Sequence, residues 1–225
     1  MENTYKTIAE KAVGLYKEKG SRFLAFGFPV TDETEIKSIL AVLRKKYHDA
    51  RHHCYAYRIG TDPFRYRAND DGEPSGTAGK PIYGQIVSHE LTNILIVVVR
   101  YFGGTLLGTN GLVTAYRSAA VRMISASTLI EKSVMITCCL TFPYSSFNGL
   151  IKIIKEEGIE HNHPVYDNTC TLTLSVPLSV FERFSAKLNL LAGITCERIH
   201  ENQAKRSREL NSEDEPLGIK KSAKT

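Results

Sequence analysis

The stretch that most constrains the fold of this chain is an unbroken apolar run from Ile94 to Val99. The run is short and rich in β-branched side chains, which favours a strand buried on both faces over a helix. Charged and aromatic residues follow it, and a glycine-punctuated stretch then leads into a helical pattern that buries Leu112, Ala115, Tyr116, Ala119 and Met123 on one face. Free N–H groups and the helix dipole at such a helix start favour an anion. We therefore expect a binding site where the strand ends.

Two glycine-containing loops flank this strand. The first, Asp70–Lys80, holds three carboxylates and a lysine, and the second, Arg100–Gly111, holds four glycines. Two interpretations of the glycines are open: they form a ligand-binding loop, or they only permit positive φ angles and close backbone approach. The arginine at the strand end is likewise either a ligand-binding group or a solvated rim charge. We expect the two loops to lie side by side as one anion-accepting surface, with Arg100 or Tyr101 directed toward Thr109–Gly111.

The segment Arg51–Ile59 has the alternation of a strand. One face presents both basic and aromatic side chains, namely Arg51, His53, Tyr55 and Tyr57. The segment Phe64–Arg67 has a similar mixture of aromatic and basic residues. This interleaving is typical of platforms for single-stranded nucleic acid. The alternative is that the tyrosines cover a helix or a neighbouring strand. The net charge of +5 permits a nucleic-acid partner without establishing one.

Around these segments the pattern is mixed. Thr4–Lys19 is ambiguous between helix and strand, with Gly14 interrupting its helical stripe, and Arg22–Val30 reads as a strand. Asp32 is an expected N-cap for a helix that runs to about Tyr47, with acids at its start and bases at its end. These charges suit the helix dipole, so the bases alone are weak evidence for a ligand.

A domain boundary is expected near Leu129–Ser133. Beyond it the predicted elements are strand Val134–Phe142, helix Tyr144–Glu157, strands Ile159–Tyr166 and Cys170–Val176, helix Leu178–Leu191 and strand Ile194–Ile199. This β-α-β-β-α-β order is that of a ferredoxin-like domain. It shows no acidic or histidine cluster, so we interpret it as an interaction module. The segment 201–225 is charged and nearly devoid of large apolar residues, and is expected to be a disordered tail.

Three motifs carry a resemblance to a known family. ARHHCYAYRIG at 50–60, NDDGEPSGTAGKPI at 69–82 and VVVRYFGGTLLGTNGLVTAYRSAA at 97–120 closely resemble the YigZ/IMPACT family. The resemblance implies an α+β chain of two domains: residues 1–130, similar to the second domain of ribosomal protein S5, and residues 134–200, similar to the ferredoxin-like last domain of a translocation elongation factor. It also implies a link to translation. It implies no reaction, because no catalytic residues are established for that family.

Other chemistry has little support in the residues. The five cysteines, Cys54, Cys138, Cys139, Cys170 and Cys196, have no C-x₂-C spacing, and most lie in apolar strand-like runs. His52 and His53 are adjacent, so in a strand only one can join a given site. His53 on the polar–aromatic face is the better candidate. We predict no catalytic residue, no metal ligand and no cofactor. The N-terminus lacks the apolar centre of a secretory signal, and no apolar run is long enough to span a membrane.

The sequence thus favours a cytoplasmic, translation-associated binding protein, a monomer whose partner is RNA, the ribosome or a translation-related protein. The alternative is an enzyme for a phosphorylated or nucleotide ligand, with Asp70, Asp71 and Glu73 handling a metal or a proton while Lys80 and Arg100 clamp phosphate. A perturbed carboxylate in a concave pocket would favour the enzyme. The candidate ligand-binding residues are His53, Arg65, Asp70, Asp71, Glu73, Ser75, Gly76, Thr77, Lys80, Arg100, Tyr101, Gly103, Gly104, Gly108 and Arg117.

Overall fold

The computed structural model describes residues 3–61, 63–161 and 170–199. The chain divides into two compact units, one of residues 2–132 and one that begins at Ser133. Each unit has its own sheet and its own buried core. Within the described ranges, no helix is long and apolar enough to cross a membrane.

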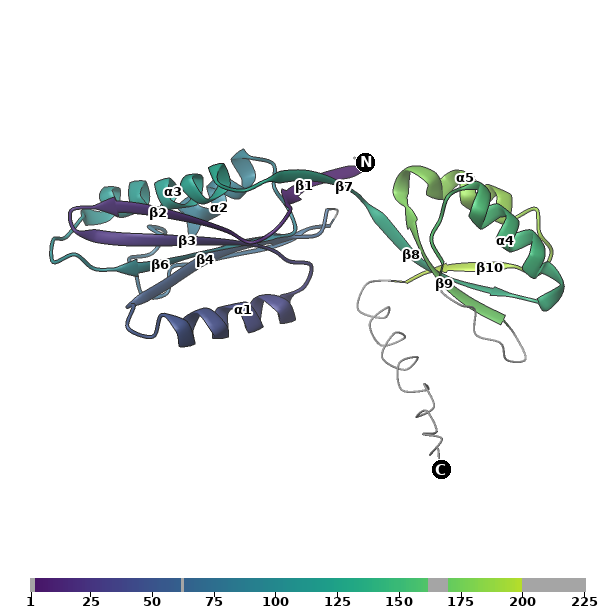
Figure 1. Cartoon of the computed structure of the whole chain (residues 1–225), viewed down its shortest axis with the longest axis horizontal. Coiled ribbons are helices and arrows are strands. Elements are labelled where there is room, and N and C mark those ends of the chain that lie inside the picture. Colours follow the sequence, from purple (N-terminus) through teal and green to yellow (C-terminus); the bar gives the residue numbers. More distant parts are fainter. Residues whose placement is uncertain (1–2, 62, 162–169, 200–225) are drawn as a thin grey trace, which may run out of the picture. The chain divides into compact units, whose positions relative to one another are not determined.

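The first unit is built on a five-stranded antiparallel sheet. In spatial order its strands are β2 (Ala12–Glu18), β3 (Ser21–Pro29), β6 (Ile94–Tyr101), β4 (His52–Ile59) and β5 (Arg65–Asn69). Helices α2 (Gly79–Ser88) and α3 (Gly108–Ser125) cover one face, and α1 (Glu33–Lys46) covers part of the other (Figure 1). The sheet is therefore the middle layer of three.

The apolar run occupies the centre of this sheet, as the sequence predicts. Every residue from Ile94 to Val99 is fully buried, because β6 lies between β3 and β4 and has helices on both faces. Side chains of β6 alternate between the two cores: Ile94, Ile96 and Val98 pack beneath α2 and α3, and Leu95, Val97 and Val99 pack beneath α1. The alternation continues at the strand end and sends Arg100 and Tyr101 to opposite faces.

The predicted helix after Asp32 is present. The Asp32 carboxylate accepts a hydrogen bond from the N–H of Glu35 at 2.9 Å, and Glu35 in turn accepts one from the N–H of Thr31 at 3.1 Å. These reciprocal bonds satisfy N–H groups that the first turn of a helix leaves without partners. Ile36, Leu40 and Leu43 are the buried positions of α1.

The ambiguous N-terminal segment forms two strands, β1 (Thr4–Ile8) and β2, and β1 joins β7 (Leu129–Ser133) in a separate two-stranded sheet. Gly14, which argued against a helix, lies where β2 passes close to α3. A Cβ atom at Gly14 would be 2.4 Å from the backbone nitrogen of Met123. The glycine is thus required by strand–helix packing.

The second unit is a ferredoxin-like domain. After β8 (Met135–Phe142), a single 3₁₀ turn η1 (Tyr144–Ser146) leads into α4 (Phe147–Glu156), and β9 (Cys170–Pro177), α5 (Leu178–Leu188) and β10 (Thr195–Arg198) follow. The antiparallel sheet order is β10-β8-β9, and His161 bridges Leu174 of β9 on its outer side. The predicted strand Ile159–Tyr166 lies outside the described residues beyond His161, as does the predicted tail. The α+β fold class, with an N-terminal domain followed by a ferredoxin-like one, is confirmed. The likeness of the first domain to the second domain of ribosomal protein S5 stays a prediction.

Candidate functional site

Asp70, the first carboxylate of the acidic loop, caps a helix. Its two carboxylate oxygens accept backbone hydrogen bonds from Gly76, Ala78 and Gly79 at 2.8–3.0 Å, so the carboxylate lies at the N-terminus of α2. Burial by itself would raise the pKa of Asp70, but these N–H groups and the nearby Lys80 outweigh it and leave the pKa below its ordinary value. The anion position at the start of α2 is therefore filled by the chain's own side chain.

Asp71 links α1 to the start of β4. One of its carboxylate oxygens accepts the backbone N–H of His53 at 2.7 Å, and the other lies 3.3 Å from the Arg44 guanidinium. The Asp71 carbonyl oxygen is 2.8 Å from Nδ1 of His52. Asp71 also adopts a positive φ of 43°, which is uncommon for a residue other than glycine.

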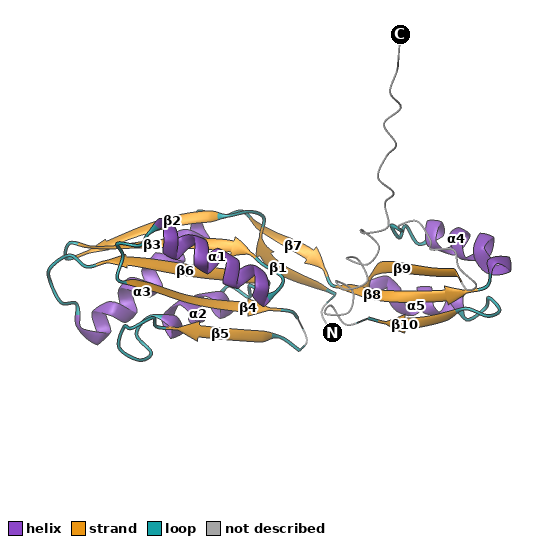
Figure 2. Cartoon of the chain, turned by 90° about the horizontal axis from the view of Figure 1, so that it is seen from below, coloured by secondary structure: helices purple, strands orange, loops and turns teal. Residues whose placement is uncertain are grey.

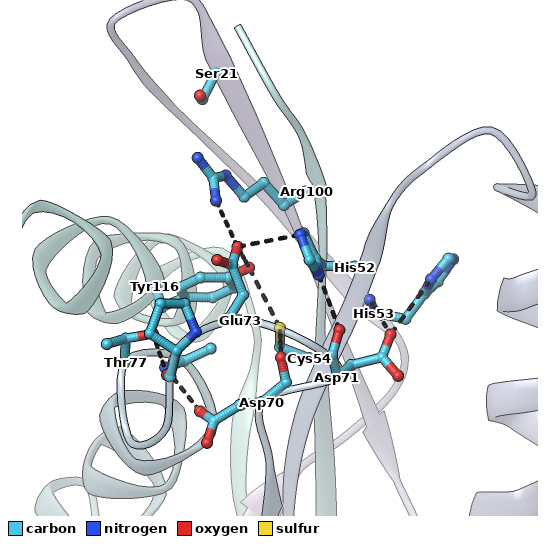
Figure 3. Close-up of polar contacts among 12 residues, drawn as sticks. Ser21, His52, His53, Cys54, Asp70, Asp71, Glu73, Thr77, Arg100 and Tyr116 are labelled. Carbon is cyan, nitrogen blue, oxygen red and sulfur yellow. Dashed lines mark hydrogen bonds and ion pairs between the residues drawn. The ribbon is translucent and has the colours of Figure 1, made fainter. Parts of the chain in front are cut away.

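Glu73 is the centre of a buried polar cluster (Figure 3). Its Oε1 accepts hydrogen bonds from Nη1 of Arg100 at 2.6 Å and from the Tyr116 hydroxyl at 2.8 Å. Nε2 of His52 lies 3.9 Å away, and the Cys54 thiol lies 3.3 Å from the Tyr116 hydroxyl. We call these five residues the Glu73 cluster. It joins the loop before α2, two neighbouring strands and α3.

The groups of the Glu73 cluster are in the protonation states of a buried structural network rather than those of a reactive site. Burial raises the pKa of the Cys54 thiol and of the Tyr116 hydroxyl well above their ordinary values, so both stay protonated and neither is an activated nucleophile. Among the described residues, no group of three or more His, Cys, Asp and Glu side chains is placed to hold a metal ion. The three carboxylates that the enzyme alternative needs are each held by contacts within the chain.

The rest of the acidic loop is arranged by its own hydrogen bonds. The Thr77 hydroxyl donates to the carbonyl of Pro74 at 2.6 Å, and the backbone N–H of Gly76 donates to Asp70. Thr77 is buried, whereas Ser75 is exposed to solvent. Of these two hydroxyls, that of Ser75 is the one open to a ligand.

The second glycine loop contacts the acidic loop through the Arg100–Glu73 pair, and it also packs against a hairpin. A Cβ on Gly103 would lie 1.9–2.4 Å from the backbone of Gly20 and Ser21, so the loop packs tightly against the hairpin between β2 and β3. Gly104 and Gly108 have positive φ angles of 86° and 69° with open space around them. The glycines of this loop thus provide close approach and left-handed backbone.

The aromatic-platform interpretation of β4 is wrong. Tyr55 and Tyr57 are each 7% exposed and pack beneath α1, so the alternative, in which the tyrosines cover a helix, is correct. His53 on the same face is also buried, and burial lowers its pKa below the ordinary histidine value. Also on this side of the sheet, Tyr101 donates a hydrogen bond to Asp49 at 2.8 Å, and Arg65 pairs with Glu33 at 3.6 Å.

Three cations, Lys80, Arg117 and Arg122, line two concavities beside α3. The first concavity, of about 280 Å³, lies between α2 and α3. It is lined by Gly76, Lys80, Pro81, Gly84, Gln85, Val113 and Arg117. A second one, of about 570 Å³, lies between α3 and Tyr16 of β2 and is lined by Arg117, Ser118, Val121, Arg122, Ser125 and Ala126. Arg117 belongs to both, and we call the combined surface the α3 groove. No Asp or Glu is among its lining residues.

An exposed aromatic group lies on the β5 side of α2. The Tyr66 ring of β5 stacks on Tyr83 of α2 with centroids 4.6 Å apart, and the Arg58 guanidinium lies over Phe64 at 4.3 Å. Tyr66 is 58% exposed and Phe64 43%. This half of the predicted basic–aromatic pattern is at the surface, unlike the half on β4.

The structure separates the predicted charged residues that lie in or near the two loops. Asp70, Asp71, Glu73 and Arg100 are held by contacts within the chain, whereas Lys80 and Arg117, together with Gly76, line the α3 groove. Sequence reasoning missed the role of Arg122 and Tyr83. Arg122 lies on the exposed side of a predicted helix, where a basic residue is unremarkable. Tyr83 lies in α2, which the sequence pattern did not reveal as a helix.

Comparison with known proteins accounts for the three motifs. Residues 19–124 match the family model described as the Impact N-terminal domain, a span that holds the acidic loop, Arg100 and most of the α3 groove. The IMPACT family member YigZ of Escherichia coli is 35% identical over 173 residues, which cover 76% of this chain and 84% of the relative.

The chain belongs to the IMPACT family. A further IMPACT family member, from Haemophilus influenzae, is 30% identical over 188 residues, covering 80% of this chain and 90% of the relative. A crystal structure described as that of a hypothetical protein has a TM-score of 0.69 and 29% identity, and the match covers 89% of this chain and all of that one. The resemblance predicted from the motifs is thus confirmed.

Proposed function

We propose that this IMPACT family protein is a cytoplasmic, translation-associated binding protein that holds RNA along the α3 groove. The observation that carries the proposal is the lining of the groove: Lys80, Arg117 and Arg122 approach two concavities that no carboxylate lines. A row of cations along a depression that no carboxylate lines suits a chain of phosphates. The family's link to translation makes RNA, alone or within the ribosome, the fitting polyanion.

The aromatic group on the other side of α2 supports the same ligand. Tyr66 presents an exposed ring that already stacks on Tyr83, so a base can continue the stack. Stacking accepts any base, because every base has a π-face. Phosphate contacts in the groove and stacking at Tyr66 together predict binding of single-stranded RNA with little sequence preference.

The proposal assigns different measurable effects to the two surfaces. A cation that contacts phosphate displaces a counterion, so its loss lowers the slope of log affinity against log salt by about 0.7 for a single strand. Loss of a stacking ring weakens binding by roughly 5- to 150-fold, the equivalent of about 1–3 kcal/mol, and leaves the salt slope unchanged.

The test is binding of a fluorescent oligouridine across a salt series from about 50 to 200 mM. Lys80→Ala, Arg117→Ala and Arg122→Ala are each expected to reduce both affinity and slope, and Tyr66→Ala to reduce affinity alone. The matched control is Lys37→Ala, because Lys37 is an exposed lysine of α1 on the opposite face of the sheet. The control should bind RNA as the unaltered chain does.

Two outcomes would contradict the proposal. One is the absence of binding at the lowest salt concentration. The other is an equal loss in the slope of log affinity against log salt in the groove variants and in Lys37→Ala. That result would mean that RNA affinity depends only on the net charge of the chain. Circular dichroism of each variant confirms that the fold is retained before affinities are compared.

A further inference from the structure

The two edges of the five-stranded sheet differ in how they are protected. At one edge, β5 is five residues long and exposes Arg65, Tyr66 and Arg67, and charged side chains discourage the addition of another strand. At the other edge, β2 is seven residues long and exposes apolar side chains: Val13 is 49% exposed and Leu15 45%. Among the described residues no strand lies beyond β2 (Figure 2).

The side chains of β2 sort cleanly between the two faces of the sheet. Ala12, Gly14 and Tyr16 lie against α3, whereas Val13 and Leu15 lie opposite Phe26 and Leu24 of β3 on the α1 side. Helix α1 packs on the other strands of this face and leaves Val13 and Leu15 half exposed. An apolar strip therefore runs along the open edge.

Cations lie at both ends of this strip. Lys11 lies over the rings of Phe26 and Phe28, 5.7 and 5.3 Å from their centroids. At the far end Lys17 lies directly opposite Arg22 of β3, and like charges at opposed positions destabilise a sheet. The Arg22 guanidinium lies over the Tyr101 ring at 4.9 Å, and an acidic group placed beside Lys17 would give that lysine an attractive partner. We call Lys11, Val13, Leu15, Lys17 and Arg22 the β2 edge surface.

The same charges disfavour a second copy of this chain as the occupant. Two β2 strands related by a two-fold axis perpendicular to the sheet pair residues of the same face. When the axis passes beside Gly14, so that the two Gly14 residues are opposite each other, Lys11 of one copy lies opposite Lys17 of the other. This register opposes like charges, which is costly in a strand pair.

We propose that the β2 edge surface docks an extended acidic segment of a partner protein, which adds to the sheet as a sixth strand. Backbone hydrogen bonds to the open edge supply affinity, and alternate side chains supply specificity. The complementary segment has acids opposite Lys11 and Lys17 and apolar residues opposite Val13 and Leu15, in the order acid-x-apolar-x-apolar-x-acid. This surface is separate from the cations that line the α3 groove, so it does not depend on RNA binding.

The test uses a fluorescent seven-residue peptide with aspartate at both ends, isoleucine at its third and fifth positions and threonine elsewhere. A peptide with lysine in place of both aspartates is its control, and one with a central proline removes the capacity to form a strand. The full chain labelled with ¹⁵N is expected to bind the acidic peptide best, with amide shifts in residues 12–18 rather than in 65–69.

A charge exchange makes the test specific. The double variant Lys11→Glu/Lys17→Glu should bind the acidic peptide on the order of tenfold more weakly and should prefer the lysine-ended peptide, because two exposed attractive pairs become repulsive. Lys37→Glu/Lys45→Glu on α1 changes the net charge equally and should bind as the unaltered chain does.

Three results would overturn the proposal. Equal affinity of the unaltered chain for both charged peptides would remove the electrostatic basis, and shifts confined to residues outside β2 would place the site elsewhere. A dimer seen in sedimentation velocity and abolished by Leu15→Asp would identify a second copy as the occupant. A loss of peptide binding in a variant that still binds oligouridine separates this proposal from the RNA-binding one.

Discussion

The guanidinium of Arg100 and the carboxylate of Glu73 form a buried ion pair between residues 27 positions apart, with 2.6 Å between Nη1 and Oε1. Both side chains are at least nine-tenths buried, and the Tyr116 hydroxyl donates to the same carboxylate oxygen. The pair fastens the end of β6 to the loop before α2, and Tyr116 adds α3. The most recognisable motifs of the chain therefore meet in a contact that organises the fold.

Removal of one partner of this pair should be strongly destabilising. Arg100→Met leaves the Glu73 carboxylate buried without its cation, and Glu73→Leu leaves the guanidinium without its anion. Each single variant is expected to lose about 3–5 kcal/mol of unfolding free energy, and the double variant to recover most of that loss, because no buried charge is then left alone. Urea denaturation followed by circular dichroism measures all three.

The control for this pair is Arg65→Met, which breaks the exposed Arg65–Glu33 ion pair in the same unit and should cost less than about 1 kcal/mol. A double variant no more stable than the two single variants combined would show that Arg100 and Glu73 contribute through separate contacts.

The capping carboxylate predicts a pH dependence of stability. The pKa of Asp70 is lowered in the folded chain, so its contribution is fully present above the ordinary aspartate pKa of about 3.9 and is lost as pH falls through the lower, folded value. Asp70→Asn is expected to cost about 1 kcal/mol near pH 7, through the lost charge at the start of α2 and the lost bond to Gly76. The difference from the unaltered chain should shrink below pH 3.9.

Unfolding free energies of both proteins across this pH range provide the measurement, with the exposed Glu131→Gln as a control that removes one negative charge from the same unit. A gap that stays constant down to the lowest pH would mean that the Asp70 carboxylate stabilises α2 by shape rather than by charge.

Local patterns predicted the elements whose stabilising partners are close in sequence. The capping residue of α1, Asp32, is three residues from the N–H group that it binds. The unbroken apolar run of β6 by itself indicates a buried strand. Helix α2 escaped prediction because its cap, Asp70, lies eight to nine residues before the N–H groups that it satisfies. The residue at its N-cap, Ala78, makes no side-chain capping hydrogen bond, so the local start signal is weak.

The candidate site was harder to predict for a related reason. Residue type indicated that Glu73, Arg100 and Lys80 carry charge, but only tertiary structure shows which charges neutralise each other. Glu73 and Arg100 are paired in the interior, and Lys80 stays at the surface beside Arg117. Strand alternation correctly grouped Tyr55 with Tyr57, yet it could not say that α1 covers that face.

Two neighbouring glycines should respond very differently to alanine. At Gly103 the added Cβ would lie 1.9 Å from the carbonyl carbon of Gly20, so the β2–β3 hairpin or the loop must move. At Gly104 the space is open and only the positive φ of 86° is unfavourable, at a cost of about 1–2 kcal/mol. Thermal melts should therefore show a much larger loss for Gly103→Ala than for Gly104→Ala. Equal losses would mean that backbone conformation, rather than close packing, explains both glycines.

The last prediction concerns the independence of the two units. The buried cores of the first unit and the core of the second share no residue, and each unit closes its own sheet. Fragments 1–132 and 133–200 are each expected to unfold cooperatively, since a domain with its own core can fold alone. Their melts should reproduce two transitions of the full chain, and removal of residues 201–225 should leave both nearly unchanged. An unfolded 133–200 fragment, or a loss of several degrees on removal of residues 201–225, would show that the second unit needs support from the rest of the chain.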